Sequence, residues 1–119
     1  MIEPIVIGFG GNVGSEVSII GRFTRVRDAL SALGTLRVAP LYRTAPIGPD
    51  QPPFVNTAVR ASIADIQPAE LIAIVLEFEG LLGRDRTREV RWGPRLIDLD
   101  VLVWGARVIR SPELDVPHP

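Results

Sequence analysis

The sequence lacks cysteine and lysine, and no long run of apolar residues occurs in it. Without cysteine the chain forms neither a disulfide framework nor a cysteine-ligated zinc site. All 13 basic residues are arginine, which excludes Schiff-base chemistry and the phosphate-binding lysine of a P-loop. No apolar stretch approaches the roughly 20 residues that span a bilayer, and the first residues lack the charged segment of a signal peptide. We therefore expect a cytoplasmic protein without a membrane partner.

The length of 119 residues, with 46% apolar and 23% charged residues, predicts a single globular domain over residues 1–119. The net charge of −1 gives no support to a polycation built for nucleic acid. A small domain with ordinary composition therefore leaves its function to be decided by local motifs.

The periodicity of apolar residues predicts two helices and several strands. Apolar residues from Ile19 to Leu33 recur in steps of three and four, as in a helix with Ser18 as its N-cap and Gly34 as its stop. A second helix is expected from Pro68 to Gly83. Strands are expected at 5–9, 36–43, 54–63, 96–104 and 108–110. The order β-α-β-β-α-β is typical of an α+β, ferredoxin-like fold, with an antiparallel sheet and both helices on one face.

Two aspartates in the last long strand are the strongest chemical signal. In Ile97-Asp98-Leu99-Asp100-Val101 the carboxylates project from one face, while Ile97, Leu99, Val101 and Val103 are expected to face the core. Two like charges on one strand face repel, and a hard cation such as Mg²⁺ would relieve the repulsion. The alternative is a solvent-facing strand with two acids of no function.

Five arginines directly precede this pair, at positions 84, 86, 88, 91 and 95. Guanidinium groups bind phosphate oxygens through paired hydrogen bonds, so this loop next to a metal site favours a polyphosphate substrate. The alternatives are a solvated loop or a nucleic-acid patch. Trp92 is expected as an exposed aromatic residue within the loop.

Other features are weaker. Residues 44–53 hold four prolines and a glycine, and beside this stiff loop Phe54 and Asn56 share a strand face that could bind a flat heterocycle or simply belong to the core. The glycine-rich loop at 10–14 does not fit a dinucleotide fingerprint and is interpreted as a turn. Glu79 is interpreted from its pattern as a boundary carboxylate, although it could point toward the site.

Four stretches together carry a family resemblance: GFGGNVG (8–14), LYRTAPIGPDQPPFVN (41–56), RWGPRLIDLDVLVWG (91–105) and LDVPHP (114–119). In this order they resemble the 6-hydroxymethyl-7,8-dihydropterin pyrophosphokinases of folate biosynthesis. The resemblance covers essentially the whole chain. It implies transfer of the terminal diphosphate of ATP to the hydroxymethyl group of the pterin, with release of AMP.

The resemblance also implies the residues of the site. Two Mg²⁺ ions would be held by Asp98 and Asp100, and ATP is the co-substrate. The implied catalytic residues are Asp98, Asp100, Arg84 and Arg95. The implied ATP contacts are Glu79, Arg86, Arg91, Trp92, Arg95, Val101 and His118. The implied pterin contacts are Thr44, Pro46, Ile47, Gly48, Phe54 and Asn56.

The chain stops where family members continue with an Arg-x-Phe segment, a strand and a helix, so a C-terminally short form is expected. Two alternatives remain at this point. One is a weakly active or inactive paralogue that binds nucleotide or pterin, and the less favoured one is a nucleic-acid-binding ferredoxin-like module. The oligomeric state is open, with a dimer as a hypothesis.

Overall fold

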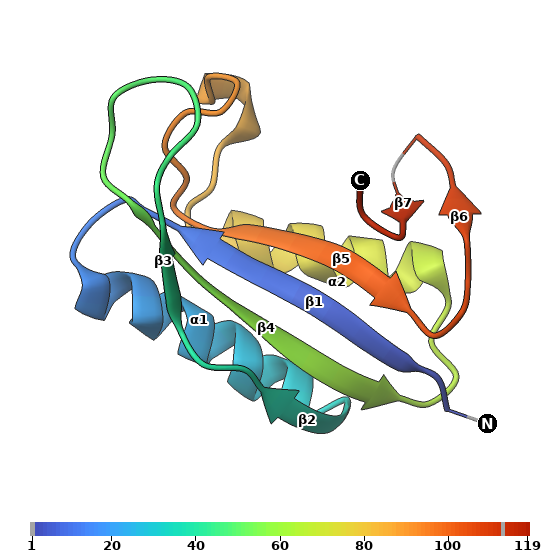
Figure 1. The fold of residues 1–119 in the computed structure, drawn as a ribbon. Helices are drawn as coiled ribbons and strands as arrows, with labels where there is room; N and C mark the ends of the chain where they lie inside the picture. The colour runs from blue at the N-terminus through green and yellow to red at the C-terminus, as the bar shows by residue number, and fades with distance from the viewer. Residues whose placement is uncertain (1, 113) are drawn as a thin grey trace.

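The computed structural model describes residues 2–112 and 114–119. Two helices pack on one face of a five-stranded antiparallel sheet (Figure 1). In chain order the elements are β1 (Pro4–Gly11), α1 (Glu16–Ser31), β2 (Gly34–Val38), β3 (Tyr42–Thr44), β4 (Phe54–Ile63), α2 (Pro68–Leu81), the 3-10 turn η1 (Arg86–Arg88), β5 (Asp98–Trp104), β6 (Ile109–Arg110) and β7 (Asp115–Val116).

The strands are ordered β2-β4-β1-β5, and β3 also pairs with β4. All pairings are antiparallel. This arrangement confirms the predicted α+β, ferredoxin-like fold. A separate two-stranded sheet of β6 and β7 was not predicted in full, because two residues are too few to show an alternating pattern in β7.

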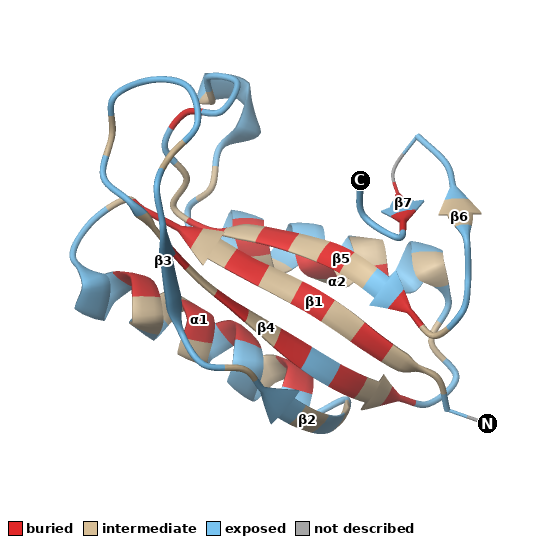
Figure 2. Cartoon of the chain, in the orientation of Figure 1, coloured by how far each residue is buried: buried red, intermediate tan, exposed pale blue. Residues whose placement is uncertain are grey.

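The alternation of burial along the strands separates the two faces of the sheet (Figure 2). Ile5, Ile7 and Phe9 of β1 are at most 2% exposed and pack against the helices. The intervening residues of β1, including Gly8 and Gly10, lie on the face that no helix covers. Because side chains alternate along a strand, the same pattern directs the polar residues of β4 and β5 onto this open face.

Helix α1 begins earlier than its apolar pattern indicates. Ser15 is the N-cap, and its side-chain oxygen accepts a hydrogen bond from the amide of Ser18. The prediction of Ser18 as the cap is therefore wrong, because a cap is set by the start of the backbone bonds and not by the first apolar residue. Leu33 lies beyond the helix and is 43% exposed.

The predicted strand over 36–43 is two strands. Pro40 has no backbone N–H to donate, and it lies in the gap between β2 and β3. Ala39 retains its link to the sheet, since its amide donates to Ala58 and its carbonyl oxygen accepts from the hydroxyl of Thr57. The break turns the chain toward the proline-rich loop.

Helix α2 starts at Pro68, as predicted, because the first turn needs no amide donor at that position. Gln67 and Glu70 form a capping box at its start. Within residues 2–112 and 114–119, neither α-helix has the length and apolar character required to cross a bilayer.

The expectation that Val103 faces the core is wrong. In β5, Val101 pairs with Ile7 and Val103 pairs with Val6, so that Leu102 is an extra residue. A bulge of this kind shifts the alternation by one position. Val103 is consequently 38% exposed, and Trp104 takes the buried position at 2%.

Candidate active site

On the open face of the sheet, glycine residues of β1 lie between β4 and β5, and we call this strip the trough. Asn56 of β4 pairs with Gly10 of β1, which pairs on its other side with Asp98 of β5. Since neighbouring strands lie about 4.8 Å apart, the backbones of Asn56 and Asp98 are separated by about 10 Å across Gly10. A Cβ atom at Gly10 would lie 3.2 Å from Oδ1 of Asn56, so glycine keeps the floor clear.

In the next row Gly8 lies between Ala58 and Asp100, and the side chain of Leu102 borders it, 3.1 Å from where a Cβ atom of Gly8 would lie. Asp98 and Asp100 therefore project together from β5, as predicted, and their side chains are 38% and 40% exposed. Burial raises the pKa of Asp100, and the charge of Asp98 raises it further, while the nearby His118 opposes the shift. The two carboxylates thus repel one another at the edge of the trough.

This repulsion fits a site for a divalent cation. Among the described residues no group of three or more acidic or histidine side chains converges as a complete metal cage. A pair of partly exposed carboxylates leaves coordination positions for water and for substrate oxygens, which is how Mg²⁺ is commonly bound. The donor set of Asp98 and Asp100 is therefore suited to Mg²⁺ that is shared with a substrate.

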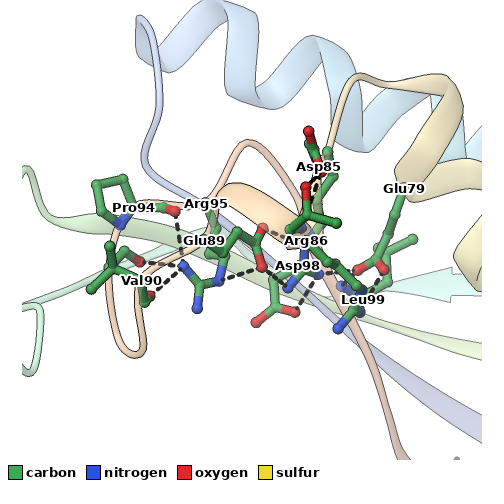
Figure 3. A network of polar contacts seen from close by, with 12 residues as sticks. Glu79, Asp85, Arg86, Glu89, Val90, Pro94, Arg95, Asp98 and Leu99 are labelled. Carbon is green, nitrogen blue, oxygen red and sulfur yellow. Dashed lines mark hydrogen bonds and ion pairs between the residues drawn. The ribbon is translucent and has the colours of Figure 1, made fainter.

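Glu79 of α2 is buried next to Asp98 and Leu99 at the start of β5 (Figure 3). One of its oxygens, Oε2, accepts hydrogen bonds from Arg84 and from the amide of Leu99, the latter at 2.9 Å. The other oxygen accepts from Arg86 at 2.7 Å. The interpretation of Glu79 as a boundary carboxylate is wrong, because two arginines and an amide supply the partners that a buried charge requires.

Arg84 is the most buried arginine of the loop, with 5% of its side chain exposed. Its Nη1 atom donates to Oδ1 of Asp98 at 3.0 Å. Burial opposes the charge on Arg84, but hydrogen bonds to Glu89 and the charges of Glu79 and Asp98 outweigh it, and the pKa of Arg84 is raised above its usual value. A fixed cation therefore lies directly beside the aspartate pair.

The other arginines of the loop differ in position. Arg95 turns back on the loop, and its Nη1 atom donates to the carbonyl oxygens of Val90, Gly93 and Pro94. Arg91 is exposed and stacks on the ring of Trp92, 4.6 Å from its centroid. Only Arg84 and Arg86 contact the acidic groups around β5 directly.

The residues predicted to bind the pterin lie at the other side of the trough. Asn56 donates from Nδ2 to the hydroxyl of Thr44 at 2.8 Å, and Phe54 pairs with Thr44 across β3 and β4. Ile47 is 73% exposed at the outer part of the proline-rich loop, where Pro46 is half-buried. Gly48 has a φ of +97°, and a Cβ atom there would lie 3.0 Å from Cβ of Trp92.

The proline-rich loop and the arginine loop thus meet at the same end of the sheet (Figure 1). No role was predicted for Asn12, the residue that joins them. Asn12, which is 2% exposed, donates to Oε1 of Gln51 and to the carbonyl of Pro52, and it accepts from the amide of Arg95. The sequence feature that could have indicated this role is that Asn12 is the one strongly polar residue in GFGGNVG.

Two predicted nucleotide contacts occupy contrasting places. His118 is 43% exposed, and its Nε2 atom lies 3.6 Å from Oδ1 of Asp100. The side chain of Val101 is buried at 3% and faces the helices, so a contact with nucleotide could come only from its backbone.

Comparison with known proteins identifies the family of this chain. The model of the family "7,8-dihydro-6-hydroxymethylpterin-pyrophosphokinase" matches residues 6–119. The chain belongs to this family. The pyrophosphokinase match includes both sides of the trough, the arginine loop and His118.

Curated relatives carry corresponding names. The 2-amino-4-hydroxy-6-hydroxymethyldihydropteridine pyrophosphokinase of Bacillus subtilis is 37% identical over 95% of this chain and 66% of the relative. The protein of the same name from Pseudomonas aeruginosa is 35% identical, over 99% and 72% respectively. A mitochondrial folate synthesis bifunctional protein of Pisum sativum is 42% identical over 98% of this chain and 22% of its own length. The chain is therefore shorter than these relatives.

Proposed function

We propose that this chain transfers the terminal diphosphate of ATP to the hydroxymethyl group of 6-hydroxymethyl-7,8-dihydropterin and releases AMP. The observation that carries the proposal is the trough, in which Asn56 and the carboxylates of Asp98 and Asp100 face one another across glycine. A separation of about 10 Å allows a bicyclic heterocycle to bind at one side and its substituent to reach the other. Membership of the pyrophosphokinase family supports the same chemistry.

In this proposal the pterin lies on the β4 side of the trough. Phe54 provides a ring for stacking, and the amide of Asn56 provides a donor and an acceptor for the edge of the heterocycle. The polypeptide around Thr44, Pro46, Ile47 and Gly48 surrounds the outer edge of the pterin. The contact of Asn56 with Thr44 orients the amide before substrate arrives.

The nucleotide lies on the β5 side. Asp98 and Asp100 would hold Mg²⁺, which neutralises phosphate oxygens and orients the attacking group when it is bound. Arg84, Arg86 and the more distant Arg91 supply further positive charge for the triphosphate, and His118 adjoins the same carboxylates. Arg95 holds the shape of the loop through the carbonyl oxygens of Val90 and Gly93, and Trp92 lies exposed on the same loop.

The transfer itself is an in-line substitution at the β-phosphorus. The hydroxymethyl oxygen forms a bond to the β-phosphorus while the bond from that phosphorus to the bridging oxygen of AMP breaks. The carboxylate oxygens of the aspartate pair can accept the proton of the hydroxyl group. Positioning and charge neutralisation supply most of the acceleration in reactions of this class.

The test is an AMP-release assay with hydroxymethyl-dihydropterin, ATP and Mg²⁺, with a chelator as the metal control. We expect Asp98→Ala and Asp100→Ala to lose activity by a factor of about 1,000 or more. Asp28→Ala is the matched control, because Asp28 is an exposed acid of α1 far from the trough in the fold. ATP binding by calorimetry without AMP release would instead support a paralogue that binds nucleotide without turnover.

A further inference from the structure

In the arginine loop, residues 84–95, the carboxylate of Glu89 contacts arginines at both ends of the loop. Glu89 accepts two parallel hydrogen bonds from Arg84, from Nε to Oε2 at 2.6 Å and from Nη2 to Oε1 at 2.9 Å. The Nε atom of Arg95 lies 3.4 Å from the same Oε1. The first and last arginines of the loop therefore share one acidic partner, and Figure 3 shows Glu89 beside Arg95.

This geometry directs Glu89 toward the arginines of the loop. Both oxygens are already bound by guanidinium groups, and the side chain is 16% exposed. The hydrogen bonds from Arg84 lower the pKa of Glu89, so its carboxylate is charged at neutral pH. A largely buried carboxylate that is bound through both oxygens by two guanidinium groups acts chiefly on those cations.

Hydrogen bonds with Asn12 and Gln51 hold the C-terminal part of the loop, whereas its N-terminal part has little apolar packing. A hollow of about 570 Å³ adjoins the loop. The hollow is lined mostly by residues of the loop itself: Arg84, Asp85, Arg88, Glu89, Val90 and Pro94. Residues 85–88 are exposed, and the 3-10 turn within them is too short to be stable alone. Apolar packing therefore does little to fix Arg84, and the ion pairs decide its position.

Arg84 depends on Glu89 for a specific orientation. One edge of its guanidinium group, through Nε and Nη2, is bound by Glu89, and Nη1 is thereby directed to Glu79 and Asp98. Paired hydrogen bonds to one carboxylate fix the plane of a guanidinium group, which a single contact does not. Without Glu89 the group could rotate about its contacts with Nη1.

We propose that Glu89 is a positioning residue for phosphoryl transfer, which holds Arg84 beside Asp98 and joins it to Arg95 so that the loop presents fixed charge to the nucleotide. The inference rests on the proposed function. It assigns Glu89 an action through the two arginines, with no contact to ATP, pterin or metal.

The first test measures catalysis. We expect Glu89→Gln to lower kcat by a factor of roughly 10 to 100 while KM for the pterin changes by less than about threefold. Glu77→Gln is the matched control, since Glu77 is an exposed acid on α2. Because Glu89 acts through Arg84, the double variant Arg84→Gln/Glu89→Gln should be within about twofold of Arg84→Gln alone. Additive losses in the double variant would overturn the inference.

The second test does not require activity. Trypsin cleaves this chain only after arginine, so digestion followed by mass spectrometry reports each arginine separately. We expect Glu89→Gln to raise cleavage within residues 84–91 by roughly tenfold, with cleavage after Arg25 and Arg27 of α1 unchanged. An equal rise at all sites would indicate global destabilisation and would contradict a local positioning role.

The two tests separate this inference from the proposed function. If the wild-type chain releases AMP but Glu89→Gln retains full kcat, or loses kcat without faster cleavage of the loop, the positioning role is wrong. If the wild-type chain releases no AMP, the proposed function fails, and the proteolysis result alone then decides whether Glu89 holds the loop.

Discussion

The side-chain amide of Asn12 donates a hydrogen bond of 2.9 Å to the side-chain oxygen of Gln51, in a loop that is distant in sequence. Gln51 in turn donates from Nε2 to the carbonyl oxygen of Trp92 at 2.7 Å. The amide of Arg95 donates to Asn12 from the other side. Three loops, namely the glycine-rich, proline-rich and arginine loops, are therefore connected through the side chain of one buried asparagine.

Replacing Asn12 should destabilise the whole arrangement. Asn12→Ala leaves the amide of Arg95 and the carbonyl of Pro52 without this partner, so we expect the free energy of unfolding to fall by about 2–3 kcal/mol. Gln51→Ala is the control, because Gln51 is only half-buried and its loss should cost about 1 kcal/mol or less. Urea denaturation of both variants measures the difference. Equal losses would show that burial of Asn12 is not the cause.

Neutralising the two aspartates of β5 should change the stability of the chain in opposite directions. Asp98→Asn removes a charged partner of Arg84, and we expect stability at pH 7 to fall, by no more than about 1 kcal/mol because the carboxylate is 38% exposed. Asp100→Asn should raise stability at pH 7, because burial and the charge of Asp98 disfavour the ionised form and raise its pKa. Both variants should lose AMP release.

The pH dependence gives the sign of the Asp100 effect. A raised pKa means that the folded chain binds the proton more tightly than the unfolded chain, so stability falls as pH rises through the interval between the ordinary value of 3.8 and the raised pKa. The stability gain from Asp100→Asn should be complete above that interval and absent below it. Thermal unfolding between pH 3 and pH 7 measures this, and a gain that grows toward acid pH would contradict the assignment.

The glycine at the centre of the trough gives a prediction about substrate binding. In Gly10→Val a side chain would enter the space beside Oδ1 of Asn56, so we expect KM for the pterin to rise at least tenfold, with stability within about 1 kcal/mol of the wild type. Gly21→Ala is the control, since no atom lies within 4 Å of the added Cβ and α1 should gain about 0.5–1 kcal/mol. An unchanged KM in Gly10→Val would argue against the trough as the binding site.

Arg37 and Arg60 lie directly opposite each other on β2 and β4, and both are exposed. Within residues 2–112 and 114–119 neither forms an ion pair. Like charges in this position repel, so we expect Arg37→Glu to stabilise the chain by about 0.5–1 kcal/mol in urea denaturation at low salt. Arg25→Glu on α1 makes the same change in net charge without a cross-strand neighbour, and an equal effect there would show that the pairing is irrelevant.

The sequence predicted the parts of the fold that depend on regular periodicity. The alternation over 54–63 was sufficient to predict a strand with one buried face. The spacing of Ile19, Phe23 and Val26 was sufficient to predict the buried face of the first helix. The extra residue at Leu102 could not be predicted, because a bulge depends on pairing with β1 and leaves no mark in the alternation before it. The cap at Ser15 was missed for a similar reason, since two serines near the helix start are equally good by residue type.

For the candidate site, the sequence predicted that Asp98 and Asp100 project from the same face of the strand, because residues two positions apart on a strand share a face. It did not predict the burial of Glu79 or the closure of the loop by Glu89. Both depend on which arginines reach them across the fold, and thirteen arginines offer too many partners for sequence spacing to select among them. The contacts of Asn12 likewise join segments far apart in the chain.

The bulge in β5 has an effect beyond the exposure of Val103. Since Leu102 is not paired with a residue of β1, its carbonyl oxygen accepts a hydrogen bond from the amide of His118 at 2.8 Å. That tether fixes where the imidazole of His118 lies relative to Asp100. The irregular point of β5 thus ties the end of the chain to the strand that carries both aspartates.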